Sequence, residues 1–268
     1  MDTKTRTSHA PPAAAQPLGA AARTPGAASP RDIAAEVLGP ARRSMSSFDP
    51  AGWEEAVAVL KRLLDRLPDH APSHAALAEC YALWGFRREL DGAEAESYYG
   101  LAYQHASRAF TLAPERADAH RALAVALRRG EHADLDRRQE EALIALDLDS
   151  NDAQNWYEYW RAFGYSPQDP AIARALELDP GLTGAHIDLG VVFYTKGRLS
   201  DARRHLERAV ALAPRNTLAL YNLAMTLAAL KLFKEAAAAL ERGLAVEPGN
   251  RLLLEGLAIL KKGADGAR

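Results

Sequence analysis

The chain has 268 residues, of which 48% are hydrophobic and 25% are charged, a balance typical of ordinary globular proteins. Its net charge of −2 provides no overall positive field that could neutralise phosphates, so we expect no nucleic-acid partner. No run approaches the ~18 apolar residues that a membrane span needs, and residues 1–30 lack the apolar block of a secretory signal. We therefore expect a cytoplasmic protein without a membrane partner.

The amino-terminal residues 1–48 are predicted to be mostly disordered. Residues 1–30 are largely Ala, Pro, Gly, Thr and Ser, with too little large apolar surface to offset the entropy lost on ordering. The pattern over Arg31–Leu38 indicates a short helix ended by Gly39. Residues 263–268 are also expected to be disordered, which leaves residues 49–262 as the folded domain.

Order is predicted to begin at Asp49, a suitable N-cap, with Pro50 in the first helical position and Pro68 after the helix. Apolar side chains follow at helical spacing: Trp53, Ala56, Val57, Leu60, Leu63 and Leu64. This single helix resembles the second half of a helix pair whose first half is missing. We number it as unit one, an amino-terminal cap.

Unit two pairs a predicted helix over His74–Trp84 with a second helix that closes at Pro114. Pro68 and Pro114 are 46 residues apart, about twelve more than the other units need. Ala93–Leu112 is compatible with helix throughout, so the extra length is predicted to extend the second helix by about two turns beyond its neighbours.

Units three and four have irregular lengths. Unit three covers Ala117–Ser150, while unit four combines a helix over Ala153–Phe163 with a shortened one over Pro170–Leu178. Trp156 and Trp160 of unit four are predicted to fill the space that the missing helical turn would leave.

Units five and six are regular, because Pro180, Pro214 and Pro248 follow one another at intervals of 34 residues. Small residues at the helix crossings permit close approach, and larger ones fill between the pairs. They are, in order, Leu189, Gly190, Phe193, Ala202, Leu206, Ala209, Leu223, Ala224, Leu227, Ala236, Leu240 and Gly243. A last helix over Asn250–Lys262, with Leu253, Leu254, Leu257 and Leu260 facing inward, is predicted to cap the stack.

This period and these positions resemble the tetratricopeptide repeat family. The resemblance implies an all-α solenoid, a right-handed superhelix of antiparallel helix pairs, with five full or near-full repeats plus terminal capping helices. It also implies a concave groove that binds a partner. The high Ala and Arg content is typical of a GC-rich bacterium, so we expect a family member of bacterial type.

In the family, the groove is lined by set positions of the first helix in each pair. Transferred to this sequence, those positions are Arg121, Val125, Arg128, Arg129, Gln154, Tyr157, Arg161, Tyr165, Ile187, Val191, Tyr194, Leu218, Tyr221 and Met225. Such a groove is basic at one end and apolar at the other. It would suit a protein or peptide segment with acidic and apolar parts. The alternative is that the apolar members pack on neighbouring helices and that the arginines form a solvated face.

No catalytic signature, phosphate-binding loop or paired cysteines occur, so we expect neither an enzyme nor a cofactor. His74, His120 and His186 share one repeat position and should be about 10 Å apart, too far for one metal ion. The predicted function is a non-catalytic scaffold or adaptor. The alternative is a self-assembling scaffold, a homo-oligomer in which the helix over Ala93–Tyr99 and the apolar end of the groove bury against a second copy.

Overall fold

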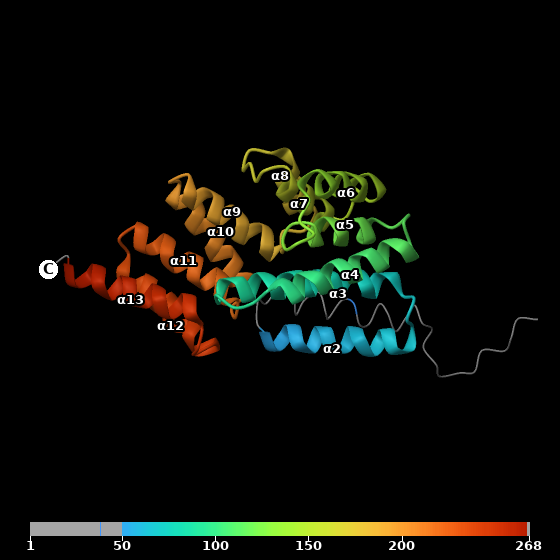
Figure 1. Ribbon diagram of the computed structural model, residues 1–268. Coiled ribbons are helices and arrows are strands. Elements are labelled where there is room, and N and C mark those ends of the chain that lie inside the picture. Colours follow the sequence, from blue (N-terminus) through green and yellow to red (C-terminus); the bar gives the residue numbers. More distant parts are fainter. Residues whose placement is uncertain (1–37, 39–49, 267–268) are drawn as a thin grey trace, which may run out of the picture.

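The computed structural model describes Leu38 and residues 50–266, which form twelve α-helices and no strand (Figure 1). The tail predicted over residues 1–48 lies outside the described residues except for Leu38, which is half-buried against α2–α5. Asp49, the predicted N-cap, is also outside them. The fold is an all-α solenoid of helix pairs, as the sequence predicts.

Every predicted unit is present: unit one as a single helix and units two to six as pairs of helices. The helices are α2 Pro50–Arg66, α3 Ala71–Leu90, α4 Glu96–Leu112, α5 Ala117–Ala126, α6 Leu135–Leu148, α7 Ala153–Ala162, α8 Pro170–Leu178, α9 Thr183–Thr195, α10 Leu199–Leu212, α11 Thr217–Ala229, α12 Phe233–Val246 and α13 Arg251–Gly266. Thus α2 is unit one, α3 and α4 form unit two, and the later pairs follow up to α11 and α12 in unit six. The cap α13 continues to Gly266, beyond the predicted end at Lys262.

Several helices begin where a side chain can satisfy a free backbone N–H group of the first turn. Asp134, Asp152 and Asp169 cap α6, α7 and α8, accepting from backbone N–H groups at 2.8–3.0 Å. Asn216 and Asn250 do the same for α11 and α13. The polar residues in the short connections therefore determine where these helices begin.

The extra length of unit two is distributed differently from the prediction. The first helix, α3, runs on to Leu90, whereas α4 begins only at Glu96, so Ala93–Ala95 is not helical. Glu94 accepts a hydrogen bond from the Ser97 backbone at 2.9 Å and thereby helps to start α4. The predicted projection over Ala93–Tyr99 is also wrong, because Tyr99 is only 4% exposed and lies under Gly85 and Gly130.

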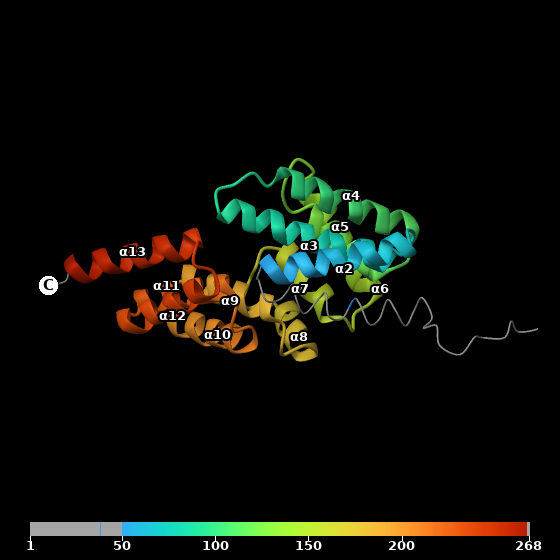
Figure 2. The same cartoon turned by 90° about the horizontal axis from the view of Figure 1, so that it is seen from below.

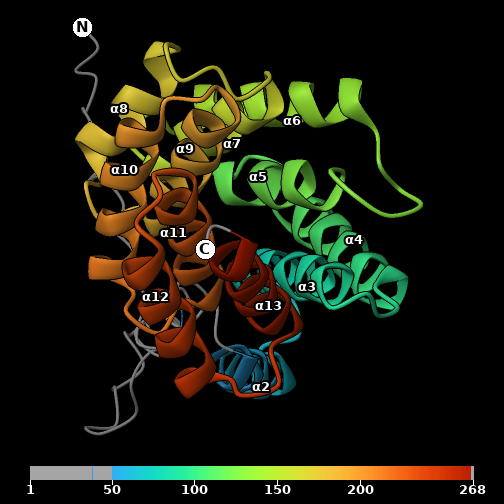
Figure 3. The same cartoon turned by 90° about the vertical axis from the view of Figure 1, so that its left-hand side faces the viewer.

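The units stack side by side and the stack curves strongly. Seen end-on, the first helices α3, α5, α7, α9 and α11 lie towards the middle and the second helices lie outside them (Figure 3). We call the side formed by the first helices the inner side. The cap α13 returns close to α3, which is also visible from below (Figure 2). The two ends of the stack are therefore neighbours in space, although they are far apart in sequence.

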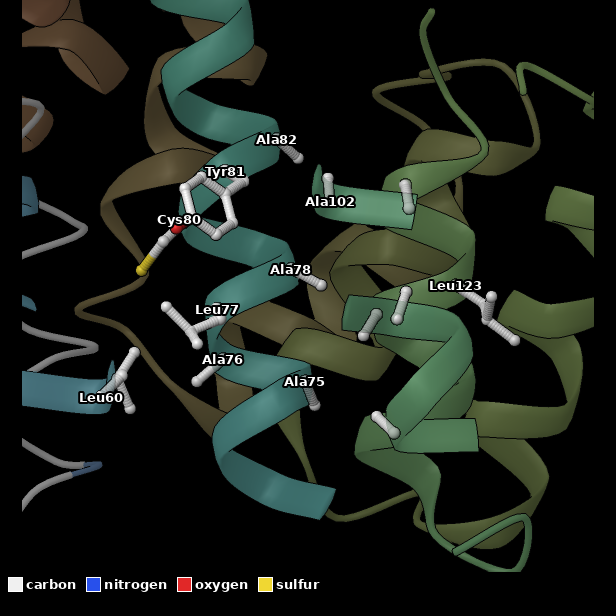
Figure 4. Packing of buried hydrophobic residues seen from close by; sticks show 14 of the residues in the cluster. Leu60, Ala75, Ala76, Leu77, Ala78, Cys80, Tyr81, Ala82, Ala102 and Leu123 are labelled. Atoms are coloured by element: carbon white, nitrogen blue, oxygen red, sulfur yellow. The ribbon is translucent and has the colours of Figure 1, made fainter. Parts of the chain in front are cut away.

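Small residues allow the helices of unit two to approach closely. Ala75, Ala78 and Ala82 point from α3 towards α4 and α5, while Leu77 and Cys80 face Leu60 of α2 (Figure 4). The same principle holds in units five and six, where the predicted Ala202 and Ala236 are fully buried. Burial raises the pKa of the Cys80 thiol, as expected for a packed rather than reactive cysteine.

Unit four confirms the predicted filling role of its aromatic residues. Trp160 is fully buried and its indole N–H donates to the Ser166 carbonyl at 2.6 Å. Trp156 is half-buried and donates to the Ser150 carbonyl at 2.8 Å. The cap α13 matches the prediction less well, since Leu253 and Leu260 are buried but Leu254 is 48% exposed.

Candidate functional site

The residues predicted to line the groove lie on successive first helices of the inner side. Arg121 and Val125 are on α5, Tyr157 and Arg161 on α7, and the remaining apolar members on α9 and α11. Arg128 follows the end of α5. The structure therefore places them in one series along the stack, but their surroundings differ widely.

Arg121 is buried, with 3% of its surface exposed, and its guanidinium is surrounded by acceptors. Its Nε donates to Glu79 of α3 at 3.0 Å, and its Nη1 donates to Asp152 and Asn155 of unit four, both at 2.8 Å. Burial alone would lower the pKa of this guanidinium, but Glu79 and Asp152 more than offset that effect and raise it. Arg121 thus ties units two, three and four together. Val125 next to it is half-buried against the core of units two and three.

Arg161 and Tyr157 meet a carboxylate from the next unit, Asp188 of α9. The Tyr157 hydroxyl donates to Asp188 at 2.7 Å, and the Arg161 Nε lies 3.4 Å from the same oxygen. Arg161 also donates to Glu158 at 2.9 Å. Tyr157 is 8% exposed, so its ring is mostly covered. These contacts join units four and five across the inner side.

The buried carboxylates Glu158 and Asp188 and the arginines around them shift one another's pKa values. Burial raises the pKa of the Asp188 carboxyl, and the hydrogen bond from Tyr157 together with the Arg128 cation offsets this only in part. Burial also raises the pKa of Glu158 against the opposing effect of Arg138, which donates to it at 2.9 Å. For Arg128, burial acts to lower the pKa, but the field of Glu158, Tyr165 and Asp188 outweighs it. A carboxylate ligand would therefore compete with carboxylates of the protein itself.

The apolar end is more accessible. Val191 and Tyr194 on α9 are 37% and 39% exposed. Leu218, Tyr221 and Met225 on α11 are half-buried against the core of units five and six. Burial, Glu255 and Tyr194 together raise the pKa of Tyr221. Ile187, in contrast, is only 6% exposed and belongs to the core.

The other three predicted positions also differ in exposure. Arg129 pairs with Glu89 at 2.6 Å and covers the ring of Phe86 at 4.9 Å. Gln154 is exposed and Tyr165 is half-buried near Arg161. The accessible apolar part of the predicted groove lies on α9 and α11, and we call it the apolar inner surface: Val191, Tyr194, Leu218, Tyr221 and Met225.

The three histidines at one repeat position hold the turns between units. Nε2 of His74, His120 and His186 lies 2.8–3.3 Å from the carbonyl oxygen of the proline six residues earlier. Their Nδ1 atoms face His105 at 2.9 Å, Glu141 at 2.6 Å and His205 at 3.1 Å, respectively. Because these partners all lie nine residues before the end of their unit, the repeat alignment could have revealed them. Within residues 50–266, no three His, Cys, Asp or Glu side chains are grouped to hold a metal ion.

An open depression of about 350 Å³ lies beside the first of these histidine pairs, on α3 and α4. It is lined by His74, Gln104, His105, Ser107, Arg108 and Thr111. Arg108 is held by Asp69 at 2.5 Å.

None of the helices in the described part of the chain combines the length and apolar composition that crossing a membrane requires.

Comparisons with known proteins agree with this architecture. Residues 193–259, from the end of α9 into α13, match the sequence model of the tetratricopeptide repeat family. No match was found among curated proteins. The crystal structure of the APC/C hetero-tetramer Cut9–Hcn1 superposes with a TM-score of 0.61 and 15% identity, covering 88% of this chain and 42% of that one.

A second similar structure is the human IFIT1 dimer with m7Gppp-AAAA. Its TM-score is 0.60 at 16% identity, covering 72% of this chain and 46% of that chain. This protein thus spans less than half the length of either chain, and the likeness concerns the fold. The repeat match over residues 193–259, the 34-residue period and the stack of helix pairs together show that this chain contains tetratricopeptide repeats.

Proposed function

We propose that this protein is a non-catalytic scaffold that binds a segment of a partner protein on its inner side. The observation that carries the proposal is the apolar inner surface, where five apolar side chains line two successive first helices and Val191 and Tyr194 are more than one-third exposed. Aromatic and branched apolar side chains in such a setting are favoured anchors for a partner. A cytoplasmic location stays a prediction of the sequence.

The apolar part of the predicted ligand has better support than the acidic part. Arg121 is enclosed by Glu79, Asp152 and Asn155, and Arg161 already contacts Glu158 and Asp188. An acidic segment would have to displace these partners, whereas an apolar segment needs no such exchange. We therefore propose a segment whose apolar or aromatic side chains contact α9 and α11. Acidic residues in it would have to compete with Glu158 and Asp188 for Arg128 as well.

The test is selection of binding peptides from a displayed random library, followed by affinity measurement with the best synthetic peptide. Tyr194→Ala and Val191→Asp should each weaken binding by about thirtyfold or more, the loss expected for an anchor residue at the centre of an interface. The matched control is Leu143→Asp, at a 48% exposed leucine on the second helix α6. Equal binding by wild type, both inner variants and the control would rule out this surface.

The alternative function is self-assembly. The segment Ala93–Tyr99 does not offer the contact predicted for it, because Ala95 and Tyr99 are buried within the chain. Exposed leucine and isoleucine side chains on the cap α13 offer another contact, since Leu254 and Ile259 are 48% and 61% exposed. Light scattering at micromolar concentration separates the two functions. A monomer supports the scaffold that binds a partner segment, while a dimer that Ile259→Glu dissociates would support assembly through α13.

A further inference from the structure

The two ends of the stack are joined by an ion pair whose cation is buried and whose carboxylate is partly exposed. Arg87, in the last turn of α3, donates from Nη1 and Nη2 to the two carboxylate oxygens of Glu247, at 3.0 and 2.5 Å. Arg87 is only 4% exposed, and Glu247 follows the last residue of α12. Such a two-pronged pair fixes orientation as well as distance.

Neighbouring groups support this pair from both sides. Nε of Arg87 donates to Asp91 at 3.0 Å, and Asn250 donates to Glu247 at 2.9 Å. Arg251, the first residue of α13, donates to the backbone carbonyl of Asp91 at 3.3 Å. Gly92 lies against the Arg251 guanidinium and has φ +68°, a backbone conformation in which a side chain would be strained.

The pair exists only because α3 is long. The other first helices contain 10–13 residues, whereas α3 contains 20, and Arg87 is its seventeenth residue. A first helix of ordinary length would end before Arg87 could reach across to Glu247. The additional residues of unit two therefore act as an arm that connects the amino-terminal end of the stack to the carboxy-terminal end.

The stack is also less continuous in one place, the junction of units four and five. There α8 has only nine residues, and α7 and α9 approach less closely than the first helices of the other neighbouring units. Tyr157 and Arg161 contact Asp188 across this junction, and one hydrophobic core joins α7 and α8 to α9, with Ile172 and Leu189 among its members. We divide the molecule at this junction, about which the core allows bending, into an amino-terminal arc, α2–α8, and a carboxy-terminal arc, α9–α13.

We propose that Arg87 and Glu247 form a latch between these two arcs, and that breaking it lets the stack open about the junction of α8 and α9. The latch sets how far the inner sides of the two arcs stand apart. Its consequence for a bound segment rests on the proposed function, since an open stack exposes more of the inner side. The latch itself does not depend on any partner.

The test measures the distance between the arcs by double electron–electron resonance. Spin labels are placed at the exposed positions Arg62 on α2 and Arg242 on α12. A second pair, Arg62 and Glu115, lies within the amino-terminal arc and reports whether that arc remains folded. The native Cys80 is fully buried and does not compete for the label.

Glu247→Arg places a second cation against Arg87 and should raise the population with a longer distance between the arcs by at least about tenfold. The distance within the amino-terminal arc should not change. The triple variant Glu247→Arg, Arg87→Glu, Asp91→Asn restores a pair of opposite charges and removes the carboxylate that would repel the new acidic side chain. Its distances should return towards those of wild type. The matched control, Glu207→Arg, reverses a charge in the exposed pair Arg203–Glu207 of α10 and should leave both distances unchanged.

The proposal is overturned if Glu247→Arg leaves the distribution between the arcs as in wild type. It is also overturned if Glu207→Arg lengthens that distance equally, or if the restored pair fails to reverse the lengthening, because the change would then not come from this contact. None of these outcomes depends on whether the apolar inner surface binds a peptide, so the latch and the proposed function can fail separately.

Discussion

The carboxylate of Glu247 accepts two hydrogen bonds from the guanidinium of Arg87, 160 residues earlier in the chain. In a stack of repeats, each unit normally contacts only its neighbours, and stability is close to a sum of local terms. This ion pair adds a contact between the second unit and the end of the sixth. The protein should therefore unfold more cooperatively than an open stack of the same length.

Removing the cation of this pair should destabilise the fold. We expect Arg87→Met to lower the free energy of unfolding by about 2–4 kcal/mol, because it leaves the Glu247 carboxylate without its charged partner. Arg87→Lys keeps the charge but loses the fork and should cost less. Urea unfolding measures both, with Arg88→Met in the same helical turn as the control. A loss for Arg87→Met no larger than for that control would contradict the expectation.

Tight packing between helices predicts a clear contrast within α12. Ala236 is fully buried, whereas Ala238, two residues later, is exposed. Ala236→Leu should overpack the crossing with α11 and reduce stability by about 1–3 kcal/mol. Ala238→Leu adds the same atoms in solvent and should change stability by less than about 0.5 kcal/mol. Thermal unfolding of the two variants measures this difference in stability. Equal melting temperatures would show that the crossing is loosely packed.

Much of the fold could be predicted because local sequence patterns determine where the helices lie and where they cross. The 34-residue spacing of Pro180, Pro214 and Pro248 placed α9–α12, and small residues such as Ala202 marked the helix crossings correctly. The course of α3 could not be predicted in the same way. Its last turn, Phe86–Leu90, carries charged residues without an apolar period, and the Glu247 carboxylate that holds it is remote in sequence.

The candidate site could be predicted only in outline. Repeat positions brought most of the predicted residues to the first helices, although Arg128, Arg129 and Tyr165 lie just after them. Whether a side chain is free depends on the register between units. Arg121 is enclosed because Glu79 and Asp152 of the two neighbouring units happen to face it. No pattern within one repeat distinguishes such an arginine from an exposed one. The role of the apolar inner surface in binding stays a prediction.

The histidine pairs should make stability depend on pH. Burial and the neighbouring histidine, His74 or His186, lower the pKa of both His105 and His205 from 6.5 to about 4, with Lys61 and Arg204 adding to the effect. The unfolded chain takes up these protons near pH 6.5, while the folded chain resists them down to about pH 4. Stability contributed by the neutral pairs is therefore full above pH 6.5 and falls as the pH drops from 6.5 to 4.

Urea midpoints measured across this range should show the fall in wild type and a shallower fall in the double variant His105→Asn, His205→Asn. The comparison uses the slope against pH, since the substitution also removes two hydrogen bonds at every pH. Parallel curves for the two proteins would mean that these rings do not carry the dependence.

Arg121 offers the sharpest distinction between a binding role and a structural one. Its guanidinium contacts three acceptors from two neighbouring units and is 3% exposed. Arg121→Met should therefore lower the free energy of unfolding by about 3 kcal/mol, since it leaves Glu79 and Asp152 without their shared cation. Arg203→Met, which breaks an exposed pair on α10, should change it by less than about 1 kcal/mol. If Arg121→Met were instead as stable as wild type but lost peptide binding, the arginine would be a ligand contact, as the repeat position alone suggests.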